Sequence, residues 1–184
     1  MSNAIGLIEL SSIAIAYAVQ DAMLKAADVR LLLARTICSG KFLIVVGGEV
    51  AGVTSSVAAG VEVAPDSIID DLVIPNIHAS VFEAISGSAT LEPAEIDALG
   101  VVETFTVASI IEAGDAAAKA ANVKLYRIHV AMAIGGKGFL LVTGDVSSVR
   151  AAVDAAVQVA MQHGVLVAQS VIPRPNRELF SEYV

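Results

Sequence analysis

Apolar and polar positions alternate along this chain in blocks, and the blocks predict strands and helices in the same order twice. Short aliphatic and β-branched runs predict strands, whereas longer stretches rich in Ala and straight-chain residues predict helices. In the first half the predicted strands are 5–10, 29–37, 42–46 and 72–74, and the predicted helices are 13–27 and 50–64. In the second half the strands are 99–104, 123–132, 139–142 and 165–172, and the helices are 107–121 and 146–163.

The amino-acid sequence repeats along with this order. AIGLIELSSIAIAYAVQDAMLKAADV at 4–29 aligns with ALGVVETFTVASIIEAGDAAAKAANV at 98–123, an offset of 94 that grows to 96 and then 98 through two short insertions. This period exceeds the about 20–50 residues of solenoid repeats and fits a duplicated domain. We therefore predict two domains, 1–90 and 91–184, with 86–97 as a linker or a short connecting helix.

Each half has the order β-α-β-β-α-β, which predicts an α+β fold in which a small sheet is covered by helices. Ser11 and Ser12 precede the first helix and offer an N-cap for it. The segment 38–41 separates two strands closely enough to predict a hairpin.

Composition indicates that each half forms a core and still leaves apolar surface. Because the 184 residues are 56% hydrophobic and 16% charged, we expect the surplus apolar surface to be buried between the subunits of an oligomer. Polar residues interrupt the apolar stretches, so no run approaches the about 18 residues that a membrane-spanning helix needs. We expect a soluble protein without a secretory leader or a transit peptide.

Net charge argues against one class of partner, and cysteine content indicates the redox compartment. A net charge of -8, with no Trp and few aromatic residues, argues against a nucleic-acid surface, which uses clustered basic residues and stacking rings. The single cysteine excludes an internal disulfide framework and fits a reducing cytoplasm.

The nearest matches to catalytic motifs are incomplete. GGEVAGVT at 47–54 fits a phosphate loop at its glycines and its Thr, but Val53 stands where the phosphate-binding Lys is required. The histidines His78, His129 and His163 do not have the spacing of metal ligands, and we expect them at the surface or at helix ends.

Two further features have plain structural explanations. Glu9 and Glu103 occupy equivalent positions of the repeat, which favours a hydrogen bond or charge pair over a complementary acid and base. GGKG at 135–138 can cradle an anion, and it fits a hairpin tip equally well. The sequence therefore does not predict an enzyme.

Several spaced motifs, present in order in both halves, resemble the bacterial microcompartment shell domain in tandem. DAMLKAADV and DAAAKAANV are each followed by a strand, a turn with Gly-Lys, a second strand, a GGEV or GDV turn and a final VIP. The resemblance covers essentially the whole chain and implies a flat hexagonal tile in a compartment shell within the bacterial cytoplasm. A tandem member implies a homotrimer whose six domains form a pseudohexamer.

The resemblance also implies which residues lie at the edge of the tile, where other shell proteins bind. Lys25 and Lys119, in the D-x-x-x-K-A-A motif, are expected to pack against neighbouring tiles. Arg174 lies in the P-R-P edge motif, whereas the first repeat reads Pro-Asn-Ile at 75–77. The edges contributed by the two halves are therefore expected to differ.

In this family the turn between the two middle strands lines the central pore. The first-repeat turn places Cys38 among Ile37, Ser39, Gly40 and Lys41. A lone cysteine is ordinarily a small buried hydrophobe, but a Ser-Gly hairpin tip is hard to bury in its own domain. The corresponding turn of the second repeat is formed by Ile134, Gly135, Gly136 and Lys137, with Met132 or Ile134 aligned to the cysteine.

Threefold symmetry would bring three copies of Cys38 to one axis. Three thiolates suit an iron–sulfur cluster with one iron left to a non-protein ligand, and they also suit zinc with a water in fourth place. TICSGKF at 36–42 resembles most the tandem tiles of propanediol-utilisation compartments, whose T-I-C-x-G-K-F turn carries a 4Fe–4S cluster on the trimer axis. On that resemblance Ser39 and Gly40 shape the loop, and their N–H groups donate toward cluster sulfurs.

The resemblance implies electron transfer across the shell, or delivery of a cluster to encapsulated redox enzymes. One alternative is a shell tile whose central pore conducts small metabolites without a cluster. A second alternative is a soluble enzyme or regulatory ligand-binding domain that uses a duplicated fold.

Overall fold

The computed structural model describes residues 4–90, 96–130 and 135–180. These residues form two compact units. One unit contains 4–77 together with 135–136, and the other contains 78–90, 96–130 and 137–180.

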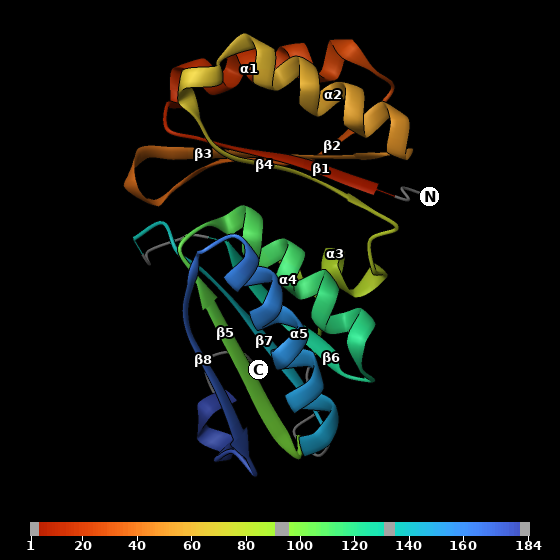
Figure 1. The fold of residues 1–184 in the computed structure, drawn as a ribbon, viewed down its shortest axis with the longest axis vertical. Helices are drawn as coiled ribbons and strands as arrows, with labels where there is room; N and C mark the ends of the chain where they lie inside the picture. The colour runs from red at the N-terminus through yellow and green to blue at the C-terminus, as the bar shows by residue number, and fades with distance from the viewer. Residues whose placement is uncertain (1–3, 91–95, 131–134, 181–184) are drawn as a thin grey trace. The chain divides into compact units, whose positions relative to one another are not determined.

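The first unit is a four-stranded antiparallel sheet with two helices packed on one face (Figure 1). The strand order is β2-β3-β1-β4, so the first strand of the chain lies inside the sheet between β3 and β4. The elements are β1 (Ala4–Leu10), α1 (Ile13–Ala26), β2 (Arg30–Ile37), the 3-10 turn η1 (Cys38–Gly40), β3 (Lys41–Gly48), α2 (Val50–Val63), the 3-10 turn η2 (Pro65–Ser67) and β4 (Ile68–Pro75).

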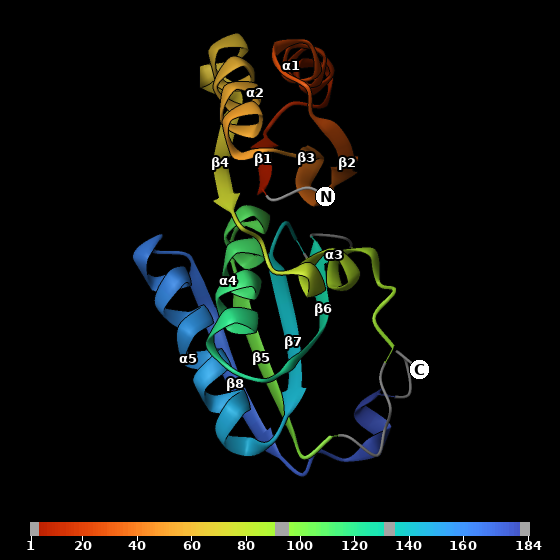
Figure 2. The same cartoon turned by 90° about the vertical axis from the view of Figure 1, so that its right-hand side faces the viewer.

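The second unit repeats this architecture. Its sheet has the order β6-β7-β5-β8, and α4 and α5 cover one face of it (Figure 2). The elements are β5 (Ala98–Thr104), α4 (Val107–Ala120), β6 (Lys124–Val130), β7 (Gly138–Gly144), α5 (Val146–Gln162), β8 (Leu166–Pro173) and a terminal 3-10 turn η4 (Arg177–Phe180). The predicted α+β fold, with one helix-covered sheet in each half, is confirmed.

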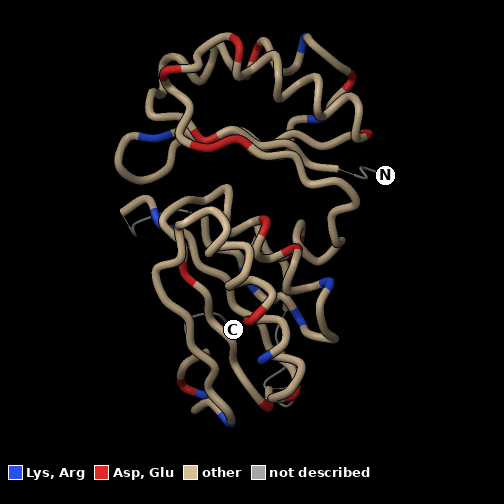
Figure 3. The backbone as a smooth tube through the Cα atoms, in the orientation of Figure 1, with Lys and Arg blue, Asp and Glu red and all other residues tan. Residues whose placement is uncertain are grey.

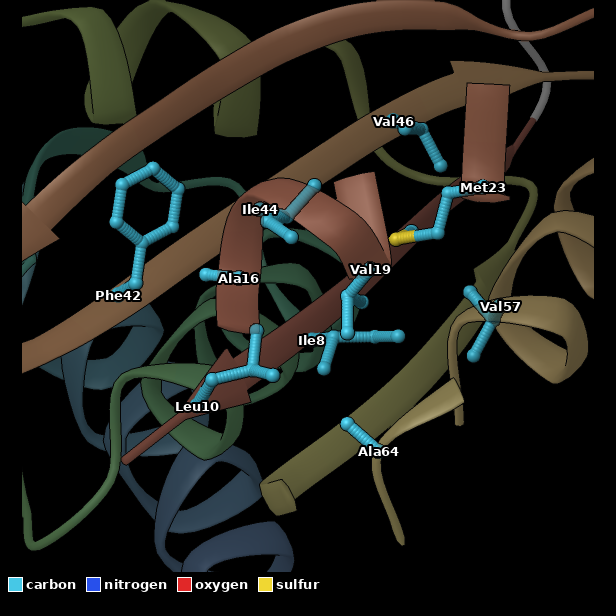
Figure 4. Packing of buried hydrophobic residues seen from close by; sticks show 10 residues of the cluster. All are labelled: Ile8, Leu10, Ala16, Val19, Met23, Phe42, Ile44, Val46, Val57 and Ala64. Carbon is cyan, nitrogen blue, oxygen red and sulfur yellow. The ribbon is translucent and has the colours of Figure 1, made fainter. Parts of the chain in front are cut away.

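Side chains from alternate strand positions form the core of the first unit with one side of each helix (Figure 4). Burying each large aliphatic side chain contributes about 1.5–3 kcal/mol, so this cluster supplies the main driving force for packing the helices on the sheet. The cluster comprises Ile8, Leu10, Ala16, Val19, Met23, Phe42, Ile44, Val46, Val57 and Ala64.

Hydroxyl groups cap the first helix of each repeat. The Ser12 Oγ accepts a hydrogen bond from the Ile15 N–H, and the Thr106 Oγ1 accepts one from the Ser109 N–H. Each bond satisfies a backbone donor that has no partner within the helix. The N-cap predicted at Ser11–Ser12 is therefore confirmed at Ser12.

The segment that joins the repeats forms a helix earlier than 86–97, the range expected from sequence. Helix α3 spans Ala79–Ser86 and ends at Gly87, whose φ of 71° is easy for a residue without a Cβ. This helix packs against β6 and α4 of the second unit, with Val81 and Ala84 buried. The compact units thus divide at 77/78, before α3, whereas the sequence-based boundary at 90/91 follows it; residues 91–95 lie outside the described ranges.

Within the described ranges, none of the helices combines the length and apolar character that crossing a membrane requires. Figure 3 shows that Lys and Arg residues are spread over both units instead of lining one element.

Candidate functional site

The turn between β2 and β3 carries the single cysteine of the chain. Ile37 pairs with Lys41 across the end of the two strands, and Cys38, Ser39 and Gly40 form the turn itself. Ser39 has φ 67° and ψ 25°, and Gly40 has φ 73°. A left-handed conformation costs a residue with a Cβ roughly 1–2 kcal/mol, so the surrounding strands must hold Ser39 in place.

The tip of this turn is open. Ile37 is buried at 5% exposure, Cys38 is half-buried, and Ser39 and Gly40 are exposed. A Cβ added to Gly40 would meet no atom within 4 Å. The turn therefore faces open space at Gly40, two residues after the cysteine.

Lys41, the residue that follows this turn, forms an ion pair with Glu9 of the neighbouring strand β1. The Lys41 Nζ lies 2.8 Å from Glu9 Oε1, and the Glu9 side chain is fully buried whereas that of Lys41 is 20% exposed. Glu9 lies opposite Leu43 in the β1–β3 register, two residues beyond Lys41, so the two side chains are diagonal neighbours on one face. The charge pair predicted for Glu9 is confirmed.

The second repeat contains the same pair beside its own turn. Lys137 Nζ lies 2.6 Å from Glu103 Oε1, with 37% and 29% of the respective side chains exposed. Gly135 and Gly136 have φ 68° and 85°, as a tight turn requires. Ile134, also predicted for this turn, lies outside the described residues, as does Met132.

The thiol of Cys38 is the one cysteine ligand that each chain can offer a metal. Among the described residues, no group of three or more His, Cys, Asp and Glu side chains could hold a metal ion. A cluster bound at this turn would thus take its thiolates from several copies of the chain, because each copy supplies one.

The histidines have structural roles. The His78 Nδ1 caps α3 by accepting from the Ser80 N–H, and His163 follows α5 with its Nε2 2.8 Å from Glu112 Oε2. His129 is in β6 instead of at a helix end, and its ring stacks on Phe139 at a centroid distance of 4.9 Å.

The two predicted edge lysines differ in their surroundings. Lys25 forms an ion pair of 2.6 Å with Asp21, and the side chains are 74% and 62% exposed. Lys119 pairs at 2.5 Å with Asp115, whose side chain is only 8% exposed. The Asp115 Oδ1 also accepts the His78 N–H at 2.7 Å, so this carboxylate ties α4 to the start of α3. The sequence shows the spacing of Asp115 and Lys119 but not this link to α3, since no local pattern joins positions 78 and 115.

Arg174 occupies the same backbone conformation as its counterpart in the first repeat. Its φ is 48°, that of Asn76 is 51°, and each residue follows the proline that ends the last strand of its unit. The Arg174 N–H donates to the Asp97 carbonyl at 2.7 Å. Arg174 is an exposed residue with a long, positively charged side chain, whereas Asn76 at the equivalent exposed position of the first repeat has a short, neutral one.

Among the residues that the structure describes, Asp145 and Arg35 have displaced pKa values. Hydrogen bonds from the hydroxyls of Ser147 and Ser148, followed by the Ser148 N–H, hold the pKa of Asp145 well below its usual range at the start of α5. Burial lowers the pKa of the Arg35 guanidinium in β2, which nonetheless stays charged near neutral pH.

Comparison with known families gives a match over both repeats. The BMC domain model matches residues 4–77 and 98–175. The chain is 50% identical over 184 residues to the bacterial microcompartment shell protein PduT of Citrobacter freundii, covering 100% of this chain and 99% of that protein. It is 31% identical over 189 residues to the carboxysome assembly protein CcmO of Synechococcus elongatus, covering 97% of this chain and 67% of that protein.

Solved structures share the same architecture. A crystal structure of a microcompartment protein from Desulfitobacterium hafniense superposes with a TM-score of 0.88 at 47% identity, covering 97% of this chain and 98% of that one. A fused, permuted hexameric shell protein from the RMM microcompartment has a TM-score of 0.65 at 23% identity, covering 86% of this chain and 83% of the other, and supports the fold alone.

Proposed function

We propose that this chain, which belongs to the BMC-domain family of bacterial microcompartment shell proteins, is a structural tile that carries a 4Fe–4S cluster on the axis of a homotrimer. The observation that carries the proposal is Cys38, one thiol per chain at the open tip of the first-repeat turn. The role is structural and redox, not enzymatic.

The proposed assembly is a homotrimer in which six domains complete a pseudohexagonal tile. Closed rotational symmetry places equivalent residues of three chains around one axis. Exposed apolar side chains of the first unit support burial between subunits: Tyr17 is 64% exposed, Leu24 38% and Leu31 36%. At its outer edge the tile would contact other shell proteins through Lys25, Lys119 and Arg174.

Three Cys38 thiolates would hold one cluster per trimer and leave one iron to a non-protein ligand. When bound, such a cluster accepts and releases one electron. The protein would supply the thiolates, and the exposed residues Ser39 and Gly40 follow Cys38 in the turn, where their backbone groups could tune such a cluster. The tile would then pass electrons between the exterior and redox enzymes inside the compartment, or deliver the cluster to them.

The competing function is a tile whose central opening conducts small metabolites without a cluster. Its support is that both turns face open space, since a Cβ added to Gly40 or to Gly135 would meet no atom within 4 Å. Zinc held by the three thiols is a further outcome to be distinguished.

Anaerobic purification followed by electron paramagnetic resonance of the dithionite-reduced trimer tests the proposal. We expect an iron–sulfur signal in the wild-type protein and in Ser39→Gly, which relieves the left-handed strain and keeps the thiol. Cys38→Ser should lose the signal and remain a folded trimer, because the turn tip buries little area. A signal that persists in Cys38→Ser would refute the axial cluster, and a colourless wild-type protein would favour the metabolite pore or, if zinc is bound, the zinc site.

A further inference from the structure

The Glu9–Lys41 ion pair is largely buried, unlike an ordinary surface salt bridge. The Glu9 side chain is fully buried in the central strand β1, and a buried carboxylate is tolerated only where it is paired. Removing one partner of a buried ion pair is strongly destabilising. The short contact to Glu9 therefore holds the Lys41 ammonium beside β1.

Lys41 is also the residue at which the cysteine turn rejoins the sheet. It begins β3, pairs with Ile37 across the end of the strands, and follows Cys38 by three positions. The turn itself contains a left-handed Ser39 and an open tip, so its conformation depends on the strand ends that flank it. The ion pair anchors one of those ends to the middle of the sheet.

We propose that Glu9 and Lys41 are a positioning pair that fixes the Cys38 turn and sets the electrostatic environment of the group bound there. The inference rests on the proposed cluster function and adds two residues to it, neither of which touches iron. The second repeat provides a comparison, because Glu103 and Lys137 form the same ion pair with more exposed side chains, at 29% and 37%. The described residues of the turn beside that pair contain no cysteine.

The two members of the pair have opposite effects on a nearby one-electron couple. Reduction adds one negative charge to the cluster, which a positive ammonium stabilises and a carboxylate destabilises. Lys41→Met should therefore make the midpoint potential more negative, and Glu9→Gln should make it more positive. A purely structural pair would move both variants in the same direction through a loosened turn.

The test is a redox titration of the anaerobic trimer with dithionite as reductant, monitored by the cluster signal. We expect each single variant to change the ratio of reduced to oxidised cluster about tenfold at fixed potential, equal to about 59 mV for one electron, in opposite directions. The double variant Glu9→Gln/Lys41→Met removes both charges and should return close to the wild-type potential. Lys137→Met is the matched control and should shift the potential less than Lys41→Met.

Amide hydrogen exchange of the iron-free trimer tests the positioning role without the cluster. Lys41→Met should raise the exchange rates of the backbone amides of Thr36, Ile37 and Phe42, at the paired strand ends beside the turn, about tenfold. Lys137→Met should raise them less. The inference would be overturned if the two single variants shifted the midpoint potential in the same direction. Unchanged amide exchange rates beside the turn in Lys41→Met would also overturn it. A wild-type trimer without any cluster would instead refute the proposed function, and the exchange rates would then decide the positioning role by themselves.

Discussion

Gly6 of β1 lies directly against Val57 of α2, so closely that a Cβ on Gly6 would stand 2.5 Å from the Val57 Cγ2. The second repeat has the same relationship, with a Cβ on Gly100 reaching within 2.6 Å of the Val153 Cγ2. These glycines, which recur at the same place in the two halves, allow a helix to pack closely on the central strand of each sheet.

Gly6→Ala should therefore destabilise the protein by about 1–3 kcal/mol, because the methyl group overpacks the contact between β1 and α2. Gly52→Ala is the control, since its Cβ would have 3.7 Å to the nearest atom and lies within a helix, where Ala is favoured by about 0.5–1 kcal/mol. Urea unfolding measures both. Equal stability of Gly6→Ala and wild type would show that the close approach is not a packing constraint.

The repeated Gly, Asp and Lys positions allow the duplicated architecture to be predicted from sequence, because periodicity and core packing impose the same pattern on both halves. The extent of the edge strand β4 is harder to predict from sequence. The apolar pattern predicts a strand at 72–74, but β4 runs from Ile68 to Pro75. Asp70 and Asp71 lie within it, and an edge strand accepts such residues because it pairs with a neighbour on one side only.

Asp145 should stabilise the start of α5 more than Glu49 stabilises the start of α2. The Asp145 side chain accepts the Ser148 N–H, whereas Glu49 at the equivalent position makes no side-chain cap. Asp145→Ala should therefore lower the midpoint of thermal unfolding more than Glu49→Ala does.

The effect of Asp145→Ala should also depend on pH. Because the folded-state pKa of Asp145 lies below its unfolded value of about 3.9, the stabilisation is fully present above that pH and is lost as the pH falls below it. Thermal unfolding of wild type and variant at neutral pH and near pH 3 measures this. A difference between the two proteins that grows in acid would contradict the capping role.

The edge lysines should respond differently to charge reversal. Lys25→Glu should change stability by less than about 1 kcal/mol, because its pair with Asp21 is exposed. Lys119→Glu would place a second carboxylate beside the buried Asp115, and we expect a loss of about 1–3 kcal/mol. Unfolding measurements on each variant test this difference.

Both reversals should weaken assembly into sheets while leaving the trimer intact, and electron microscopy of the double variant is the measurement. The charge-neutral Lys25→Gln separates loss of the ammonium from repulsion by the new carboxylate. Unchanged sheets from the Lys25→Glu/Lys119→Glu variant would show that these lysines are not at the tile edge.

The candidate site was predictable in part. The sequence places Cys38 at a hairpin tip and indicates a charge pair for Glu9, and the structure supplies Lys41 as its partner. The recurrence of Glu9 and Lys41 as Glu103 and Lys137 is the signal that could have identified the pair. The link between Asp115 and His78 was not predictable, because it depends on how α3 packs against α4 within the second unit.

The most direct test of the central claim is the iron and sulfide content of the anaerobic protein, measured on particles whose mass by light scattering is three times the 18.8 kDa chain. One chain offers one cysteine, so the account predicts one 4Fe–4S cluster per three chains, lost completely in Cys38→Ser trimers. One cluster per single chain, or full iron and sulfide in Cys38→Ser, would contradict it.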